Sequence, residues 1–263
     1  MSAVMSIVRS KDGTSIAFDQ VGGGPPLVLV VGAFNDRSTG APLAEVLAAD
    51  FTAITYDRRG RGDSGDTAPY AIEREIEDID ALIEEVGGQA SVFGYSSGAA
   101  LALKAAAAGS AIARLALYDL PPVVDDGRPR DAVDHAATLG ELIAQGRRGD
   151  AVEYFQSKLA ALPDEVVAQL RHAPFRPALE AMAHTLVYEA MIVGERWHPK
   201  ELASSITVPT LAVAAGAGSP VLPAAAGALA AAVPDGRAIT LEGQTHDIDP
   251  TVLGPILRDF LVR

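Results

Sequence analysis

Short aliphatic runs recur along this chain, and they constrain its fold more than any other feature. Each run is too short for a helix and is typical of a strand that is buried on both faces. The expected strands are Leu27–Val31, Phe51–Tyr56, Ala90–Phe93, Ala111–Tyr118, Thr210–Ala214 and Ala238–Leu241. Helical patterns alternate with them, as at Ile72–Val86 and Pro250–Val262. Buried strands that alternate with helices predict an α/β fold, a mostly parallel sheet with helices on both faces.

Two more strands are expected before these runs. Ser6–Arg9 and Ser15–Gln20 lie on either side of the dipeptide Asp12-Gly13, which is a strong signal for a hairpin turn. The chain has 263 residues, and 49% of them are apolar. It is therefore long enough for one α/β domain with a sizeable core and an inserted subdomain.

The alternation of strands and helices stops between about Asp125 and Ser205. This region shows only helical patterns, at Asp131–Ala144, Ala151–Leu162, Glu165–His172 and Ala178–Met191. We therefore predict two parts. Residues 1–124 and 206–263 form the α/β core, and residues 125–205 form a helical cap, or lid, inserted between two core strands.

Composition excludes several classes of function. The net charge is −13, from 21 basic and 34 acidic residues, and this argues against a nucleic-acid partner because phosphate contacts need a basic face. The chain has no cysteine, which excludes thiol catalysis and Cys-ligated zinc. No apolar run approaches the ~20 residues of a membrane span, and no signal peptide is evident at the start. We expect a soluble cytoplasmic protein without a membrane partner, cofactor or metal.

The turn after the strand Ala90–Phe93 carries the clearest chemical signal. Residues 92–101 read VFGYSSGAAL, so glycines enclose Ser96 in a G-x-S-x-G pattern. A strand that ends at Phe93 and a helix that begins near Ser97 leave room only for a tight turn, with a strained apex and small neighbours. We expect Ser96 to be a nucleophile. Because Ser97 opens the helix, its backbone N–H is expected to point toward an anion beside Ser96.

A nucleophilic serine needs a base that accepts its proton. The chain has five histidines, and four of them fall in the expected cap. His246 instead follows the strand Ala238–Leu241 after a short loop, at the carboxyl edge of the sheet where Ser96 is also expected. We therefore expect His246 to be the base.

Three motifs together point to a family. They are GYSSG at residues 94–98, DRRGRGDS at 57–64 and EGQTH at 242–246. In this order and spacing the chain resembles the α/β-hydrolase superfamily over nearly its whole length. The resemblance implies the α/β-hydrolase fold and a catalytic order of serine first and histidine near the end. The run 57–64 is similar to the D-x-R-G-x-G-x-S loop of these enzymes, and we expect it to shape the turn after its strand without a catalytic role.

The chain departs from the family at the acid of the catalytic triad. These enzymes usually carry it in a G-x-x-D pattern after the strand that follows the cap, where this chain has Ser219. In some members the acid comes from an earlier strand end, and Asp119, directly after Ala111–Tyr118, is our predicted replacement. Asp247 and Asp249, beside the histidine, are weaker alternatives. We expect the Asp119 carboxylate to lie within about 2.6–3.2 Å of the His246 ring.

A second oxyanion donor is expected from the loop after Leu27–Val31. By position, the backbone N–H of either Ala33 or Phe34 supplies it, and the sequence does not choose between the two. Asn35 is expected to cap the helix that follows.

The predicted function is a serine hydrolase that cleaves an ester-like acyl bond of a small molecule through an acyl-enzyme. A serine at the turn disfavours epoxide hydrolase and dehalogenase chemistry, which use aspartate there. Carbon–carbon bond hydrolysis and perhydrolysis remain possible with the same residues. A different class, a non-catalytic protein that binds a small ligand, is also open because Ser219 stands where the acid is usual.

Overall fold

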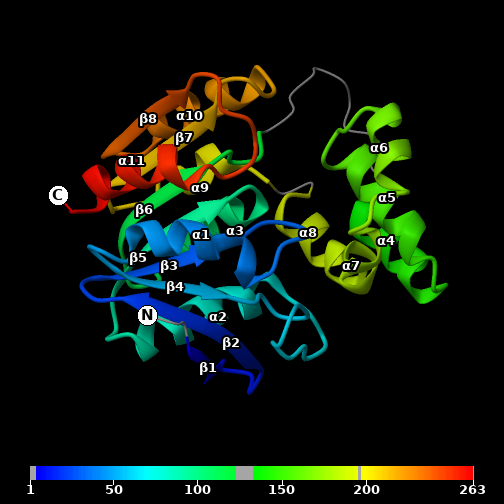
Figure 1. Cartoon of the computed structure of the whole chain (residues 1–263), viewed down its shortest axis with the longest axis horizontal. Helices are drawn as coiled ribbons and strands as arrows, with labels where there is room; N and C mark the ends of the chain where they lie inside the picture. The colour runs from blue at the N-terminus through cyan, green and yellow to red at the C-terminus, as the bar shows by residue number, and fades with distance from the viewer. Residues whose placement is uncertain (1–3, 123–132, 195–196, 263) are drawn as a thin grey trace. The chain divides into compact units, whose positions relative to one another are not determined.

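The expected sheet is present, with eight strands in the order β1-β2-β4-β3-β5-β6-β7-β8 (Figure 1). The computed structural model describes residues 4–122, 133–194 and 197–262. The strands are β1 (Val4–Arg9), β2 (Ser15–Gly22), β3 (Pro26–Val30), β4 (Thr52–Tyr56), β5 (Ala90–Tyr95), β6 (Ile112–Tyr118), β7 (Thr210–Ala215) and β8 (Gly236–Leu241). β2 runs antiparallel to β1 and β4, and all other neighbours are parallel. The predicted fold class is confirmed.

Contacts divide the chain into two compact units, residues 1–124 with 198–263 and residues 125–197. The first unit contains the sheet and its helices. These are α1 (Arg37–Leu47), α2 (Ile72–Glu85), α3 (Ser97–Ala108), α9 (Pro199–Ala203), α10 (Val221–Ala232) and α11 (Pro250–Val262). α1 and α11 pack together on one face of the sheet, and α2, α3, α9 and α10 cover the other. Burial of apolar side chains on both faces explains why the central strands are aliphatic throughout.

The core on the α1 and α11 face reaches the carboxyl edge of the sheet. Its buried members include Leu43 and Leu47 of α1, Leu257 of α11, and Tyr95 and Tyr118 at the ends of β5 and β6. Parallel strands end at the same edge, so the segments that follow β3, β5, β6, β7 and β8 gather there.

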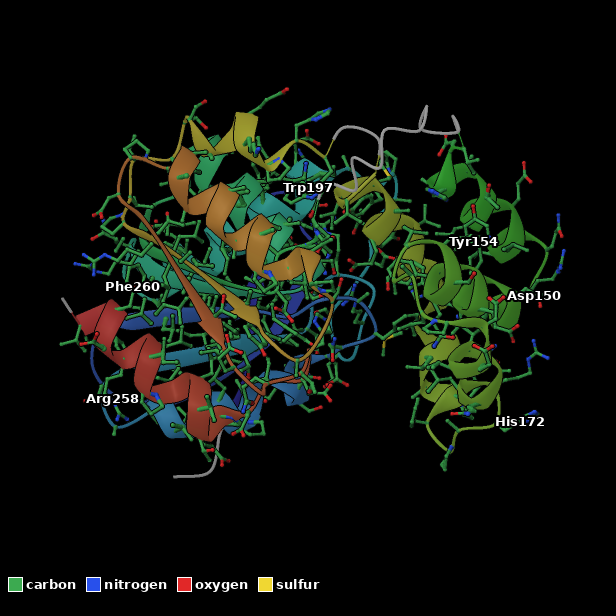
Figure 2. The ribbon with its side chains drawn as sticks, turned by 90° about the horizontal axis from the view of Figure 1, so that it is seen from above. Asp150, Tyr154, His172, Trp197, Arg258 and Phe260 are labelled. Atoms are coloured by element: carbon green, nitrogen blue, oxygen red, sulfur yellow. The ribbon has the colours of Figure 1, made fainter. Side chains whose placement is uncertain are left out.

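The second unit is helical. Its elements are α4 (His135–Ala144), α5 (Arg148–Lys158), α6 (Asp164–Leu170), α7 (Arg176–Ala181), the 3-10 turn η1 (Ala183–Thr185) and α8 (Leu186–Ile192). Buried Leu139, Phe155 and Leu186 contribute to its interior. On α5, whose Asp150 and Tyr154 are labelled in Figure 2, the Tyr154 hydroxyl lies 2.8 Å from Nδ1 of His135.

Several expected elements differ from the structure. Ala178–Met191 was expected to be one helix, but it is divided into α7, η1 and α8. At η1 the Thr185 N–H and hydroxyl both donate to the Met182 carbonyl, which is the i to i−3 bonding of a 3-10 turn. The strand Ala238–Leu241 is exposed except at Leu241 because β8 is at the sheet edge.

The boundaries of the inserted unit also differ from the expectation. The division between units lies after residue 197 rather than 205, because α9 packs on α3 and α10 of the first unit. The expected start of the insertion at 125, and of its first helix at 131, lie outside the described residues. No helix within the described ranges combines the length and apolar character needed to cross a lipid bilayer.

Candidate active site

Ser96 is the single residue between the end of β5 and the start of α3, and its backbone has the strained geometry expected of the turn. Its φ is 57° and its ψ is −127°, a conformation that non-glycine residues rarely adopt. The neighbouring glycines are required by close backbone contacts. A Cβ on Gly94 would lie 2.6 Å from Cα of Ala99, and a Cβ on Gly98 would be still closer to the Val30 carbonyl oxygen, at 2.3 Å. The sharp turn leaves the Ser96 side chain half-buried rather than enclosed.

The buried carboxylate of Asp119 contacts His246. Nδ1 of His246 lies 2.8 Å from Oδ2 of Asp119, and the other carboxylate oxygen accepts the Ala215 N–H at 2.7 Å. The Asp119 side chain is fully buried, whereas that of His246 is half-exposed. A carboxylate at Nδ1 favours the tautomer with the proton on that nitrogen, which leaves Nε2 as the acceptor. The distance lies in the expected range, and the catalytic role of the pair stays a prediction.

The other candidates for the acid take no part in this contact. Ser219 is exposed in the segment after β7. Asp249 accepts from the N–H and hydroxyl of Thr251 at the start of α11, and these bonds hold the pKa of its carboxyl below the usual value. Asp247, directly after the histidine, is exposed. Of the three aspartates, Asp119 is the one whose carboxylate is hydrogen-bonded to the His246 ring.

Two tyrosines that the sequence analysis did not single out support His246. The Tyr118 hydroxyl donates to the carbonyl oxygen of Thr245 at 2.7 Å, which ties the histidine loop to the end of β6. The Tyr95 ring lies beside the imidazole of His246, with 5.0 Å between ring centroids, and stacks on Tyr118. Burial, and then the charges of nearby aspartates, raises the pKa of Tyr95, so its hydroxyl stays neutral. The sequence could have indicated both tyrosines, because Tyr95 directly precedes Ser96 and Tyr118 directly precedes Asp119.

The loop after β3 distinguishes the two expected oxyanion donors. The Ala33 N–H donates to the Ser97 hydroxyl at 2.9 Å, so this amide is already engaged. Because the Ala33 N–H is engaged, Phe34 is the stronger candidate of the two donors. Phe34 has a positive φ of 62°. The expected cap at Asn35 is wrong, because Asp36 caps α1 by accepting from the Ser38 N–H.

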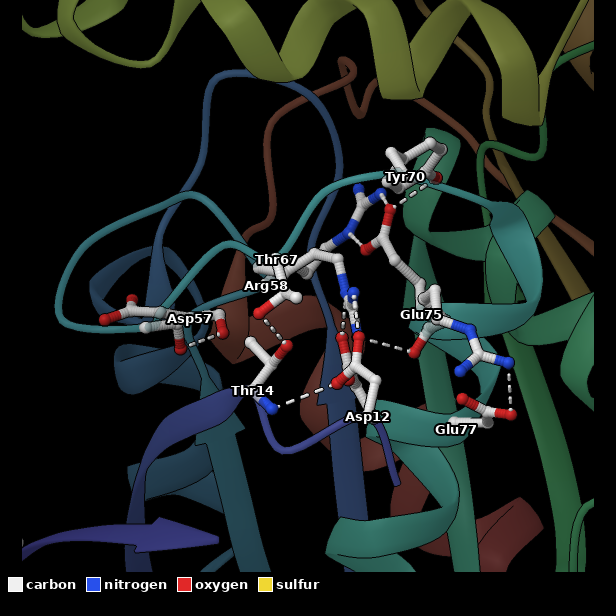
Figure 3. A network of polar contacts seen from close by, with 12 residues as sticks. Asp12, Thr14, Asp57, Arg58, Thr67, Tyr70, Glu75 and Glu77 are labelled. Carbon is white, nitrogen blue, oxygen red and sulfur yellow. Dashed lines mark hydrogen bonds and ion pairs between the residues drawn. The ribbon is translucent and has the colours of Figure 1, made fainter. Parts of the chain in front are cut away.

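The DRRGRGDS loop carries a buried network of ion pairs (Figure 3). Arg58 binds both oxygens of Glu75, at 2.7 and 2.8 Å, and all of these atoms belong to side chains that are almost fully buried. The Tyr70 hydroxyl also donates to Glu75. Arg59 binds Asp78 in the same bidentate manner. These pairs satisfy the charges that the fold buries and keep the loop rigid.

The described part of the chain has no cluster of His, Asp or Glu suited to hold a metal ion. The helical unit contains an open hollow of about 550 Å³ between α4, α5 and α6. Its lining includes Ser157 and Tyr154 but no histidine, so it lacks a serine–histidine pair. This hollow therefore offers no second candidate for the serine–histidine pair.

This arrangement is typical of enzymes that carry a nucleophilic serine on a strand-to-helix turn. It combines a strained serine, a histidine and a buried aspartate at the carboxyl edge of an α/β sheet. Residues 27–252 match the model of the alpha/beta hydrolase family, so the chain belongs to that family. It is similar to a solved alpha/beta hydrolase from Sphaerobacter thermophilus, at 51% identity and a TM-score of 0.90, over 97% of this chain and 100% of that one.

Other relatives are more distant. A pimeloyl-[acyl-carrier protein] methyl ester esterase from Xanthomonas campestris is 29% identical over 245 residues, 87% of this chain and 90% of the esterase. An enol-lactonase from Burkholderia xenovorans has a TM-score of 0.71 at 23% identity, over 98% of this chain and 100% of that one, and shows the shared fold alone. Family membership, the solved hydrolase from Sphaerobacter thermophilus and the esterase from Xanthomonas campestris support a hydrolytic function.

Proposed function

We propose that this chain is a serine hydrolase that cleaves an ester-like acyl bond of a small molecule. The observation that carries the proposal is the 2.8 Å contact between the buried Asp119 carboxylate and His246, at the sheet edge that also holds the strained Ser96. In this proposal Asp119 supplies the acid that is missing at Ser219. This supports the hydrolase over the alternative, a non-catalytic binding protein, which was motivated by Ser219.

The proposed reaction proceeds through an acyl-enzyme. Nε2 of His246 accepts the Ser96 proton as Oγ attacks the substrate carbonyl carbon, while the N–H groups of Ser97 and Phe34 stabilise the oxyanion. The imidazolium, paired with Asp119, then donates its proton to the leaving alcohol. Water attacks the acyl-enzyme with His246 as base, which releases the acid and regenerates the Ser96 hydroxyl.

We propose that the helical unit of residues 125–197 acts as the cap and selects the substrate. Its insertion point supports this role, because the chain leaves the core shortly after Asp119 at the end of β6. We also propose a small-molecule substrate and a cytoplasmic location, without a membrane or cofactor partner. The acidic charge of −13 argues against a nucleic-acid partner.

The test is hydrolysis of p-nitrophenyl esters of increasing acyl length, together with a methyl ester suggested by the curated relative. Ser96→Ala and His246→Ala should both abolish turnover. Ser96→Ala removes only a half-buried hydroxyl and should leave thermal unfolding nearly unchanged, whereas His246→Ala also removes the partner of the buried Asp119 carboxylate, so its folding is checked separately. A variant that keeps most of the wild-type turnover, after contaminants are controlled for, contradicts the assignment. A substrate with a hydrolysable carbon–carbon bond, added to the same panel, tests the alternative that the chain cleaves carbon–carbon bonds.

A further inference from the structure

The hydroxyl of Ser97 has a position that its expected role does not explain. Its side chain is buried, and Oγ accepts the Ala33 N–H at 2.9 Å. The two segments are in close contact, since a Cβ on Gly32 would lie 2.9 Å from Cβ of Ser96 and 3.2 Å from the Ser97 hydroxyl. The residue after the nucleophile therefore binds the loop after β3 through its side chain, in addition to offering its own backbone N–H.

The carbonyl groups of this loop are held by the side chains of Arg61 and Asn35, of which Asn35 belongs to the loop itself. The buried Arg61 donates through Nη1 to the carbonyl oxygen of Gly32 at 2.6 Å and to that of Asn35 at 3.1 Å. The Asn35 amide donates to the Ala33 carbonyl at 2.6 Å, and the Thr39 hydroxyl donates to the Asn35 side-chain oxygen. The carbonyls of three loop residues thus all accept from side-chain donors.

These contacts also determine where the loop's N–H groups point. In a planar trans peptide, the C=O of one residue and the N–H of the next point in opposite directions. Holding the Gly32 carbonyl on Arg61 therefore directs the Ala33 N–H away from Arg61, toward the Ser97 hydroxyl. Holding the Ala33 carbonyl on Asn35 likewise fixes the direction of the Phe34 N–H.

We propose that Ser97, through its hydroxyl, and Arg61 are positioning residues that hold the loop 32–35 so that the Phe34 and Ser97 N–H groups face one oxyanion. The inference rests on the proposed hydrolase function and adds to it. It also assigns a role in the site to the DRRGRGDS motif, whose expected role was limited to shaping a turn.

The expected effect is on the transition state, in which negative charge develops on the substrate oxygen. Loss of an oxyanion donor costs about 10²–10³ in turnover, so a displaced donor in Ser97→Ala should lower kcat by about 10–100-fold. KM should change by less than about 3-fold, because the ground-state carbonyl depends less on these bonds. Arg61→Lys keeps the positive charge but replaces the planar guanidinium by a single ammonium, and should show the same pattern.

The experiment measures kcat and KM for a p-nitrophenyl ester together with amide hydrogen exchange of residues 32–35. Wild type, Ser97→Ala and Arg61→Lys are compared with Ser110→Ala, a control just beyond the opposite end of α3. Faster exchange confined to the loop, with lower kcat and little change in KM, is expected in the first two variants and not in the control.

The outcomes separate this inference from the proposed function. Wild-type protein without esterase activity counts against the function, while the exchange data still decide whether the Ser97 hydroxyl holds the loop. Active wild type with unchanged exchange in both variants overturns the inference and leaves the function standing. A loss of kcat without faster loop exchange, or faster exchange at unchanged kcat, also overturns it.

Discussion

Replacing Asp119 by asparagine removes one charge with almost no change of shape. Oδ1 of Asp119 accepts the Ala215 N–H at 2.7 Å, so the asparagine oxygen should keep that place and its NH₂ group should face Nδ1 of His246. Two N–H donors cannot face each other, so the ring must move its proton to Nε2. Nε2 then cannot accept the Ser96 proton, and the imidazolium loses its partner.

The expected loss is large. In serine triads of other proteins this substitution lowers turnover by about 10⁴-fold. At about 1.36 kcal/mol per tenfold change in rate, that corresponds to about 5 kcal/mol of lost transition-state stabilisation. Folding should change little, because the bond to Ala215 is retained and the two side chains have the same volume.

The assay is steady-state hydrolysis of a p-nitrophenyl ester, with thermal unfolding as the control for folding. Ser219→Ala should have nearly wild-type turnover, since Ser219 is exposed and lies outside the contact. Adding Ser219→Asp to the Asp119→Asn variant tests whether a carboxylate at the family's usual position partly restores turnover. If Asp119→Asn keeps more than about a tenth of wild-type kcat, the triad reasoning in terms of tautomer and charge is refuted.

Three further changes test the supports of the site. Tyr118→Phe removes the hydroxyl that anchors the histidine loop and should lower kcat by up to about 10²-fold through misplacement of the base; wild-type kcat would contradict this. Gly98→Ala places a Cβ 2.3 Å from the Val30 carbonyl and should cost about 1–3 kcal/mol in urea unfolding; unchanged stability would show that the turn tolerates a side chain. Glu75→Gln leaves the buried Arg58 without its counter-charge and should cost about 3–5 kcal/mol, and a loss below about 1 kcal/mol would contradict the ion-pair account.

The same carboxylate predicts a pH dependence of stability. Burial alone would raise the pKa of Glu75, but the adjacent Arg58 charge and its hydrogen bonds bring it below the usual value. The stabilisation is therefore present above the unfolded-state pKa and is lost as pH falls through the lower, folded-state pKa. Stability measured across the acid range should fall less steeply in Glu75→Gln than in wild type, and equal slopes would contradict this.

The sheet and the placement of the principal candidate residues were predictable because they depend on local pattern and topology. Aliphatic runs must be buried on both faces, and the ends of parallel strands meet at one edge. That edge is why Asp119 and His246, far apart in the sequence, could be expected together. The strained turn at Ser96 was predictable from the glycines on either side of it. The structure shows why they are glycines, because backbone contacts exclude a side chain at both positions.

The remaining features depend on side-chain direction, which spacing does not specify. Asn35 and Asp36 are both suitable helix caps, and their choice depends on whether the Asn35 amide reaches the Ala33 carbonyl. The Ser97 hydroxyl could equally have bonded within its own turn. α1 contains Gly40 and Pro42 and has no clean helical pattern, yet it forms because Leu43 and Leu47 are buried against the sheet.

Covalent labelling with a fluorophosphonate, read by peptide mass spectrometry, tests the central claim most directly. The account predicts one adduct, on Ser96, that is absent in Ser96→Ala and forms much more slowly in His246→Ala and Asp119→Asn. The reagent reacts preferentially with activated serines, so it reports the nucleophile without knowledge of the substrate. Absence of an adduct from the folded wild-type protein would contradict the account and favour a non-catalytic binding protein. An adduct on a residue other than Ser96 would contradict the assignment of the nucleophile.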